Sequence, residues 1–289
     1  MTMRLQVVHR TKYRYESPVT YSYNEARLSP QTTATQTVLA SSVRTDPSTT
    51  ALRYWDYWGT QVTAFDLHRP HRALEVTATS TVETDSDLAA PGAEAAPGIG
   101  AGTAWEVLED QRFRDLHSEF LSPTQYTGFE PSMASAAAEV ADQPDPASAV
   151  HRAAELVRDH LTYKSGATGV RTTAAQAWEA KSGVCQDFAH ITIALLRQVG
   201  VPARYVSGYL HPKIAPEVGT TVVGESHAWI EGWVGNWLAV DPTNGSPVGP
   251  RHVLIGRARD YRDVSPFRGI YASAGGSTLE VSVEVTRLR

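Results

Sequence analysis

Apolar and polar residues alternate along much of the first ninety or so positions of the chain. Residues 74–82 read L-E-V-T-A-T-S-T-V, in which every second side chain can face a common core. A period of two predicts strands that bury one face. Proline and glycine separate these segments, and short strands at such spacing predict a β-rich, sandwich-like or barrel-like module over residues 1–87. The other segments with strand-like alternation or β-prone residues are 5–7, 13–15, 38–40 and 62–65.

A change of composition follows this module. Residues 88–104 read L-A-A-P-G-A-E-A-A-P-G-I-G-A-G-T-A. Alanine, glycine and proline supply too little apolar surface to order such a segment, so we expect a linker. The second module is predicted to span residues 105–277.

Helical periodicity begins in this second module. Asp145 and Pro146 form a helix-start signal, with an N-cap followed by proline at the first helical position. A second helix is expected from Thr173 to near Gly183. A third is expected to begin close to Cys185 and to end at Gly200. The third is apolar over most of its circumference, which predicts a central, buried helix.

The period returns to two after Pro202. Residues 204–210, 227–233 and 237–241 are predicted strands, the last two joined across Gly235 and Asn236. Residues 278–286 alternate cleanly and can join the N-terminal sheet.

Composition excludes several partner classes. The chain has 289 residues, of which 42% are hydrophobic and 20% charged, with a net charge of -5. This balance gives no basis for nucleic-acid or anionic-membrane binding, and no apolar run is long enough to span a bilayer. The N-terminus lacks the apolar core of a signal peptide, so a cytoplasmic protein is expected. The oligomeric state is left open.

Cys185 is the only cysteine, so it cannot form an intrachain disulfide. It is either a small buried apolar group or a working thiol. A thiol works as a nucleophile when it is ionised, which a helix N-terminus and a neighbouring imidazole favour. The imidazole in turn needs an acceptor to orient it. His227 and Asp241 lie on one predicted hairpin and can supply both groups.

The length of the hairpin loop decides whether these two side chains meet. A two-residue loop at Gly235 and Asn236 would place His227 and Asp241 on opposite faces, because side chains alternate along each strand. A three-residue loop, 234–236, leaves them diagonal to each other on one face, and a five-residue loop, 232–236, places them directly opposite. The pairing therefore predicts an odd loop or a bulge.

Four sequence blocks in this order resemble the transglutaminase-like superfamily of papain-fold cysteine enzymes. The first module likewise resembles the bacterial transglutaminase N-terminal region. The core blocks are residues 183–190 (G-V-C-Q-D-F-A-H), 204–209 (R-Y-V-S-G-Y), 226–229 (S-H-A-W) and 241–244 (D-P-T-N). The N-terminal blocks are residues 13–15 (Y-R-Y) with 18–19 (P-V), 24–28 (N-E-A-R-L) and 57–59 (Y-W-G).

The resemblance implies a catalytic triad: Cys185 as nucleophile, His227 as general base and acid, and Asp241 as the orienting carboxylate. It also implies an α+β core with the cysteine on a helix and the other two residues on a sheet. The animal enzymes of this family are activated by calcium, but no EF-hand-like loop occurs here, so no metal and no cofactor are expected.

The expected function is cysteine-dependent cleavage of an amide in a peptide or protein substrate, through a thioester. Hydrolysis by a peptidase or amidase is favoured, protein-glutamine transamidation is an alternative, and a non-catalytic peptide-binding module is another. Some roles near the thiol are open. Gln176 is a weak candidate for the oxyanion donor, the expected roles of Asp187 and His190 are structural, and three tryptophans are either groove or core. These tryptophans are Trp229, Trp233 and Trp237.

Overall fold

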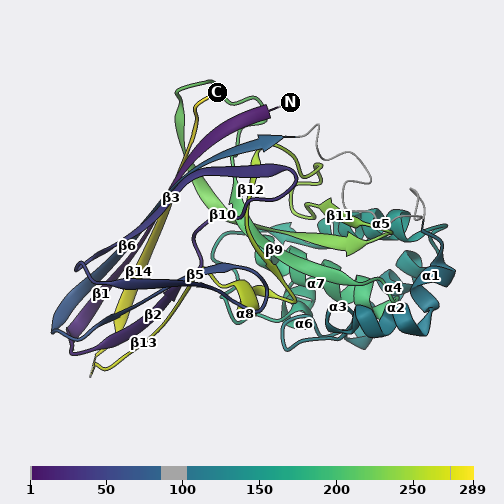
Figure 1. The fold of residues 1–289 in the computed structure, drawn as a ribbon. Helices are drawn as coiled ribbons and strands as arrows, with labels where there is room; N and C mark the ends of the chain where they lie inside the picture. The colour runs from purple at the N-terminus through teal and green to yellow at the C-terminus, as the bar shows by residue number, and fades with distance from the viewer. Residues whose placement is uncertain (1, 86–102, 274) are drawn as a thin grey trace.

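The computed structural model describes residues 2–85, 103–273 and 275–289, which form a β-rich lobe beside an α+β core (Figure 1). The β-rich lobe is built mainly from the first six strands. Figure 1 shows β10 crossing from this lobe into the core. The strands of the lobe are β1 (Thr2–Val19), β2 (Ser22–Ala26), β3 (Gln36–Asp46), β4 (Ala51–Trp55), β5 (Gln61–Leu67) and β6 (His71–Asp85).

Helices and further strands alternate in the second part of the chain. The helices are α1 (Trp105–Glu109), α2 (Gln111–Leu116), α3 (Ser118–Leu121), η1 (Pro131–Met133, a 3-10 turn), α4 (Ala134–Ala141), α5 (Pro146–His160), α6 (Ala174–Ala180), α7 (Cys185–Gln198) and α8 (Tyr261–Val264). The strands are β7 (Thr162–Tyr163), β8 (Ser182–Gly183), β9 (Ala203–Leu210), β10 (Thr221–Trp233), β11 (Trp237–Val240), β12 (His252–Ala258), β13 (Phe267–Tyr271) and β14 (Ser277–Arg287).

One sheet connects the two parts of the molecule. Its strand order is β12-β9-β10-β14-β1-β6-β3, with β11 paired to β10. A four-stranded sheet, β13-β2-β5-β4, packs on the N-terminal part of this sheet over a shared apolar core. The alternation along residues 74–82 reflects that packing, because side chains of β6 are buried at every second position. The sandwich-like module and the α+β class are therefore confirmed.

The helix α7 lies at the centre of the core. Almost all of its side chains from Phe188 onward are buried, and it packs against β10, α5 and α6. It begins at Cys185 and is followed by Gly200, whose φ of +84° suits a residue without a Cβ. The helix α5 begins as its sequence predicts, since the Asp145 side chain accepts a hydrogen bond from the Ser148 N–H. Within the described residues no helix combines the length and hydropathy needed to cross a bilayer.

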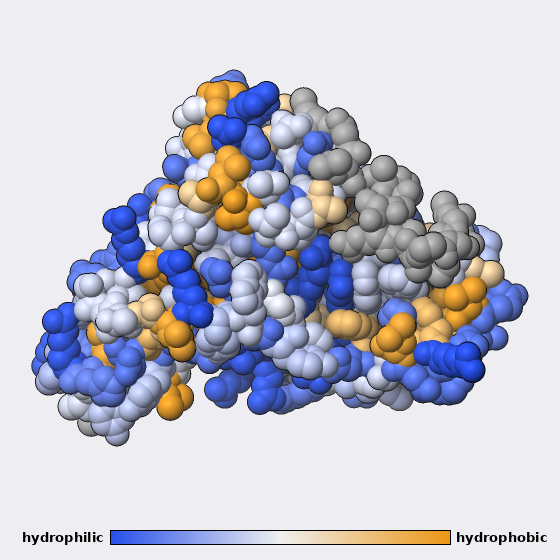
Figure 2. Space-filling view, viewed as in Figure 1, coloured by the Kyte–Doolittle hydropathy of each residue, from blue (hydrophilic) through white to orange (hydrophobic). Residues whose placement is uncertain are grey.

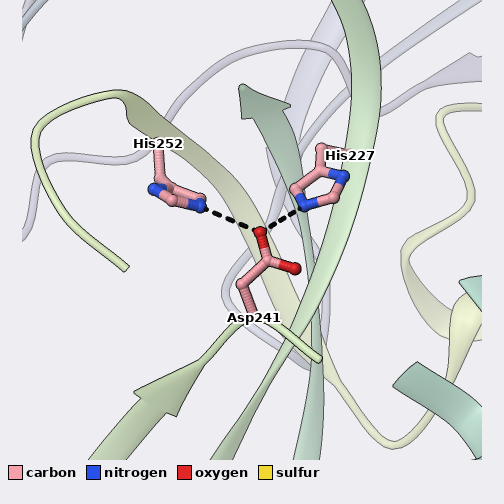
Figure 3. A group of neighbouring side chains, drawn as sticks. All are labelled: His227, Asp241 and His252. Carbon is pink, nitrogen blue, oxygen red and sulfur yellow. Dashed lines mark hydrogen bonds and ion pairs between the residues drawn. The ribbon is translucent and has the colours of Figure 1, made fainter. Parts of the chain in front are cut away.

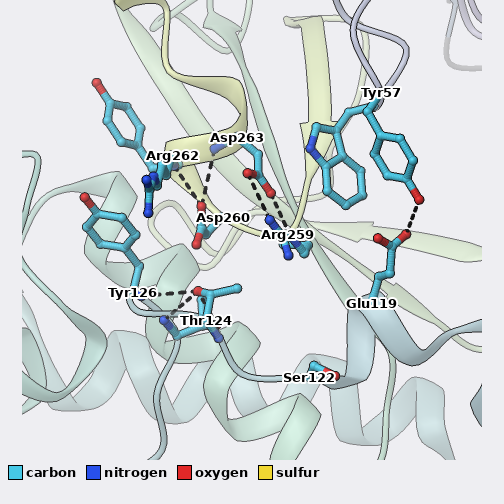
Figure 4. A network of polar contacts seen from close by, with 12 residues as sticks. Tyr57, Glu119, Ser122, Thr124, Tyr126, Arg259, Asp260, Arg262 and Asp263 are labelled. Carbon is cyan, nitrogen blue, oxygen red and sulfur yellow. Dashed lines mark hydrogen bonds and ion pairs between the residues drawn. The ribbon is translucent and has the colours of Figure 1, made fainter.

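The lobe and the core also touch through side chains. Figure 4 shows Tyr57, in the β4–β5 turn, donating a hydrogen bond to Glu119 of α3 at 3.0 Å. Close by, Arg259 pairs with Asp263 of α8. The buried Arg197 of α7 donates hydrogen bonds to several backbone carbonyls, including Phe120 O and Arg259 O. It thereby connects α7 to α3 and to the segment that follows β12.

Some predicted elements differ from the structure. The segments at 5–7 and 13–15 are one strand, β1, because both pair in a continuous register with β6. The strands β2 and β4 were not predicted, and every residue of β4 is exposed, which removes the alternation signal. Most of the expected linker, residues 88–102, lies outside the described residues. The domain boundaries stay a prediction.

Candidate active site

Cys185 is the first residue of α7 and follows the short strand β8 with one residue, Val184, between them. Val184, just before it, is extended, and its N–H donates to the Asp187 carboxylate at 2.8 Å. Thr168 Oγ1 donates to the same carboxylate oxygen at 2.5 Å. A Cβ on Gly183 would lie 2.7 Å from the Asp187 side chain, so this position, at the end of β8, needs glycine. Asp187 thus has the structural hydrogen-bonding role that was expected, and the thiol lies at the helix N-terminus.

The β10–β11 hairpin brings the other two residues together. Trp233 pairs with Trp237, which leaves a loop of residues 234–236, and Gly235 in this loop has a φ of +99°. The predicted odd loop is confirmed. His227 and Asp241 therefore share a face of the hairpin, and His227 Nε2 lies 2.8 Å from Asp241 Oδ2. Cys185 lies close enough to the same ring to contribute to its raised pKa.

Asp241 is fully buried, and five hydrogen-bond donors converge on its carboxylate. The backbone N–H groups of Thr243 and Asn244 donate to Oδ1 at 3.0 and 3.1 Å. The Asn244 side chain donates to Oδ2 at 2.8 Å. The imidazoles of His227 and His252 approach Oδ2 from two sides, as Figure 3 shows. Both oxygens are thus fixed, and one of them is aimed at His227.

His252, at the start of β12, is a contact that sequence reasoning missed. The N–H of Gly249 donates to its Nδ1 at 3.2 Å. That bond makes Nδ1 an acceptor, so the proton of the neutral ring sits on Nε2, which faces Asp241 Oδ2 at 3.4 Å. No spacing in the sequence indicates this contact, because the sheet order alone brings β12 close to the hairpin. Asn244 could have been found, since it lies in the block 241–244.

Burial and hydrogen bonding set the charges in this group. Burial alone would lower the pKa of His227, but its hydrogen bonds with Asp241 and Cys185 outweigh burial and raise the pKa to about 10. Burial would raise the pKa of Asp241, yet the bonds from His227 and His252 bring it far below its ordinary value. Burial lowers the pKa of His252, which therefore stays neutral near pH 7. The arrangement stabilises an imidazolium between a carboxylate and a thiol sulfur.

Side chains of His227, Asp241 and His252 are also close enough to share a metal ion, with their ligand atoms within 4.8 Å of one another. Each of these atoms already takes part in the hydrogen bonds described above. The expectation that no metal is required stays a prediction.

The remaining candidates near the thiol have structural contacts. Gln176 completes the N-cap of α6, where its Oε1 accepts the Thr173 N–H at 3.0 Å. His190 is fully buried, and its Nε2 accepts the Tyr261 N–H at 3.2 Å. Trp229 is buried in the core. Trp233 and Trp237 pack on each other and on Phe113 of α2 and Phe120 of α3. Trp229 is therefore a core residue, whereas Trp233 and Trp237 are partly buried in an aromatic cluster.

Tyr163 is an exposed aromatic side chain near the thiol. Its hydroxyl donates to Glu225 at 3.3 Å, and its pKa is raised to about 12, first by burial and then by the charges of Glu225 and Cys185. Glu225 precedes His227 by two residues on β10. An aromatic ring that is hydrogen-bonded to a carboxylate therefore lies near Cys185.

Matches to known proteins cover almost the whole chain. The profile of the Bacterial transglutaminase-like N-terminal region matches residues 5–83, and that of the Transglutaminase-like superfamily matches residues 134–242. A protein of Mycobacterium leprae is 46% identical over 285 residues, 99% of either chain. A Protein-glutamine gamma-glutamyltransferase of Pseudomonas aeruginosa is 36% identical over 86 residues, 28% of this chain and 13% of that one.

A solved structure has the same fold. It is the protein from Cytophaga hutchinsonii described as a "putative cysteine protease", with a TM-score of 0.77 and 23% sequence identity, and the match covers 100% of this chain and 92% of that one. The range that the superfamily profile matches, residues 134–242, includes Cys185, His227 and Asp241. The chain therefore belongs to the transglutaminase-like superfamily, and its N-terminal part is a bacterial transglutaminase-like N-terminal region.

Proposed function

We propose that this protein is a cysteine-dependent amide-bond enzyme in which Cys185 is the nucleophile, His227 the general base and acid, and Asp241 the orienting carboxylate. One observation carries the proposal. A single imidazole connects a thiol at a helix N-terminus with a buried carboxylate that accepts five hydrogen bonds. A binding surface alone has no need for this arrangement.

The chemistry follows from these positions. The thiolate of Cys185 attacks the amide carbonyl carbon, and its electron pair forms the new C–S bond while the carbonyl oxygen becomes an oxyanion. The backbone N–H of Cys185, at the N-terminus of α7, is a donor for that oxyanion. The imidazolium of His227 then gives its proton to the leaving amine as the C–N bond breaks. A thioester and a neutral imidazole remain.

Water completes a hydrolytic cycle. His227 takes a proton from water as the hydroxyl oxygen attacks the thioester carbon, and the carboxylic acid leaves as the C–S bond breaks. The thiolate and imidazolium are thereby restored. Attack by a primary amine in place of water gives transamidation with the same three residues. We favour hydrolysis of a peptide or protein amide, because Cys185 is only partly buried and water can reach a thioester formed there.

Transamidation is the second candidate, supported by the sequence similarity to the Pseudomonas aeruginosa Protein-glutamine gamma-glutamyltransferase. The match covers 28% of this chain. The two reactions differ in the acceptor, so they are separated by supplying the trapped acyl-enzyme with water alone or with a primary amine and weighing the product.

Iodoacetamide alkylation measured across pH tests the proposal. An imidazolium-paired thiolate reacts well below the pH at which an ordinary thiol ionises, near 8.5. His227→Asn should abolish the reaction at low pH. Mass spectrometry of Cys185 after incubation with cell extract should then find an acyl adduct, which Cys185→Ala cannot carry. Reaction confined to pH above 8.5, with no adduct, would leave the peptide-binding module as the better interpretation.

A further inference from the structure

The strand β14 has an open edge over half of its length. It pairs with β1 from Ser277 to Arg287 in an unbroken antiparallel register. On its other side it pairs with β10 over only four residues, 283–286 of β14 with 221–224 of β10. Within the described part of the chain, no strand pairs with residues 277–282 on that side. In an antiparallel strand every second residue directs both its N–H and its C=O to the same edge, so this edge presents a row of backbone donors and acceptors.

Residues 277–282 are also exposed on both faces. All six are exposed, whereas Val283 and Val285, farther along the strand, are buried. Two of the exposed residues are apolar, Leu279 at 55% and Val281 at 49%. Figure 2 shows hydrophobic residues reaching the surface in several separate patches of the β-rich lobe.

This edge lacks the features by which proteins usually protect open strands. It contains no proline and no bulge, and Glu280 is its single charged residue. A regular, partly apolar edge of this kind is a template for an additional strand.

The open edge begins where β10 turns toward the candidate active site. Gly224 is the last residue of β10 paired with β14, and from Glu225 onward β10 pairs with β9 instead. His227 follows Gly224 by three residues, about 10 Å along a strand. Figure 1 shows β10 and β14 diverging from this point, one toward the core and one along the lobe. A segment lying beside residues 277–282 would therefore have one end next to Glu225, the carboxylate bonded to Tyr163 near the thiol.

We propose that residues 277–282 of β14 bind an extended polypeptide segment of the acyl-donor substrate as an added β-strand, which guides the chain toward Cys185. This inference rests on the proposed function and makes its substrate a polypeptide with an unfolded stretch, not a small free amide. The backbone edge supplies affinity that is independent of side chains, and Leu279 and Val281 favour apolar residues at alternate substrate positions. A second copy of this protein fits less well, because an edge strand of a folded domain would bring that whole domain into the angle between β10 and β14.

The experiment compares the alkylation of Cys185 by three reagents on the full chain. The first is iodoacetamide. The second is a linear ten-residue peptide of alternating valine and threonine with a C-terminal lysine. It carries an N-terminal bromoacetyl group, which alkylates the thiol. The third is the same peptide with every second amide N-methylated, which cannot pair as a strand. We expect the plain peptide to react about tenfold faster than the methylated one, since several backbone hydrogen bonds separate them.

Proline variants locate the binding edge. Leu279→Pro and Glu280→Pro are made separately, because one of these two residues directs its N–H to β1 and the other to the open edge. The variant that keeps the wild-type unfolding temperature is the one with the outward N–H. In that variant we expect the plain peptide to alkylate Cys185 no faster than the methylated peptide does. The rate of alkylation by iodoacetamide should be unchanged.

The ratio of the two peptide alkylation rates tests whether β14 binds the substrate as an added strand. The rate of alkylation by iodoacetamide below pH 8 separately tests the proposed function. Equal rates for the plain and methylated peptides on the wild type would overturn the inference even where iodoacetamide reveals an activated thiol. A wild-type dimer in solution that the tolerated proline variant converts to a monomer would also overturn it, because the edge would then belong to a second copy.

Discussion

Replacing Asp241 by asparagine tests the arrangement around His227, because donors surround this carboxylate on every side. In Asp241→Asn the new NH2 group must face either the two backbone N–H groups at Oδ1 or the three side-chain donors at Oδ2. The first orientation loses two buried hydrogen bonds and the second loses three. At about 1–2 kcal/mol for each unpaired buried donor, the first costs about 2–4 kcal/mol. The melting temperature should fall on the order of 10 °C.

The same substitution should change the chemistry of the thiol. Without the carboxylate charge, the His227 imidazolium loses the interaction that raises its pKa to about 10. We expect alkylation of Cys185 by iodoacetamide at pH 6 to fall at least tenfold, and the pH profile to shift toward alkaline values. Asp159→Asn, an exposed acid on α5, is the matched control and should leave both measurements unchanged. If Asp241→Asn melts within a degree or two of the wild type and keeps its pH profile, the reasoning on the donors is wrong.

Three further outcomes follow from the geometry. His252→Phe keeps an aromatic ring but removes the N–H donor, so alkylation at pH 6 should slow several-fold, whereas His252→Gln, which restores an N–H, should recover most of the rate. A Cβ on Gly208 would lie 2.1 Å from Val253 O, so Gly208→Ala should lower the melting temperature by several degrees while Gly128→Ala, with nothing nearer than 3.9 Å, should not. The raised pKa of His227 stabilises the fold fully below pH 6.5, and this stabilisation is lost as pH rises toward 10. The difference in melting temperature between wild type and His227→Asn should therefore shrink from pH 6 to pH 10. A difference that stays constant over this range would contradict the prediction.

Local signals in the sequence were enough to predict the elements that carry the candidate triad. The position of α7 follows from the apolar run after Cys185 and from Gly200, at which the helix was expected to end. The hairpin loop could be predicted as odd because side chains in a strand alternate strictly, so one shared face for His227 and Asp241 restricts the loop length. These inferences need only neighbouring residues and elementary strand geometry.

Contacts set by sheet order could not be predicted in this way. His252 reaches Asp241 because β12 lies next to β9, and β9 next to β10, an order that no spacing in the chain encodes. The strand β12 is buried along almost its whole length, so it shows neither a period of two nor a helical period. The fully exposed β4 carries no alternation for the opposite reason.

The continuity of the large sheet bears on how the N-terminal region serves the candidate site. The hydrophobic cluster beneath β14 contains Leu5 and Val82 from the first module together with Tyr209, Val253 and Val285 from the rest of the chain. The two parts of the sequence therefore share one core at the place where β10 leaves β14. Since β10 carries His227 three residues beyond that place, the N-terminal sheet fixes the direction in which β10 enters the core. The N-terminal region thus supports the position of His227 through β14, because its removal would take away β1, the strand that pairs with β14 along its whole length.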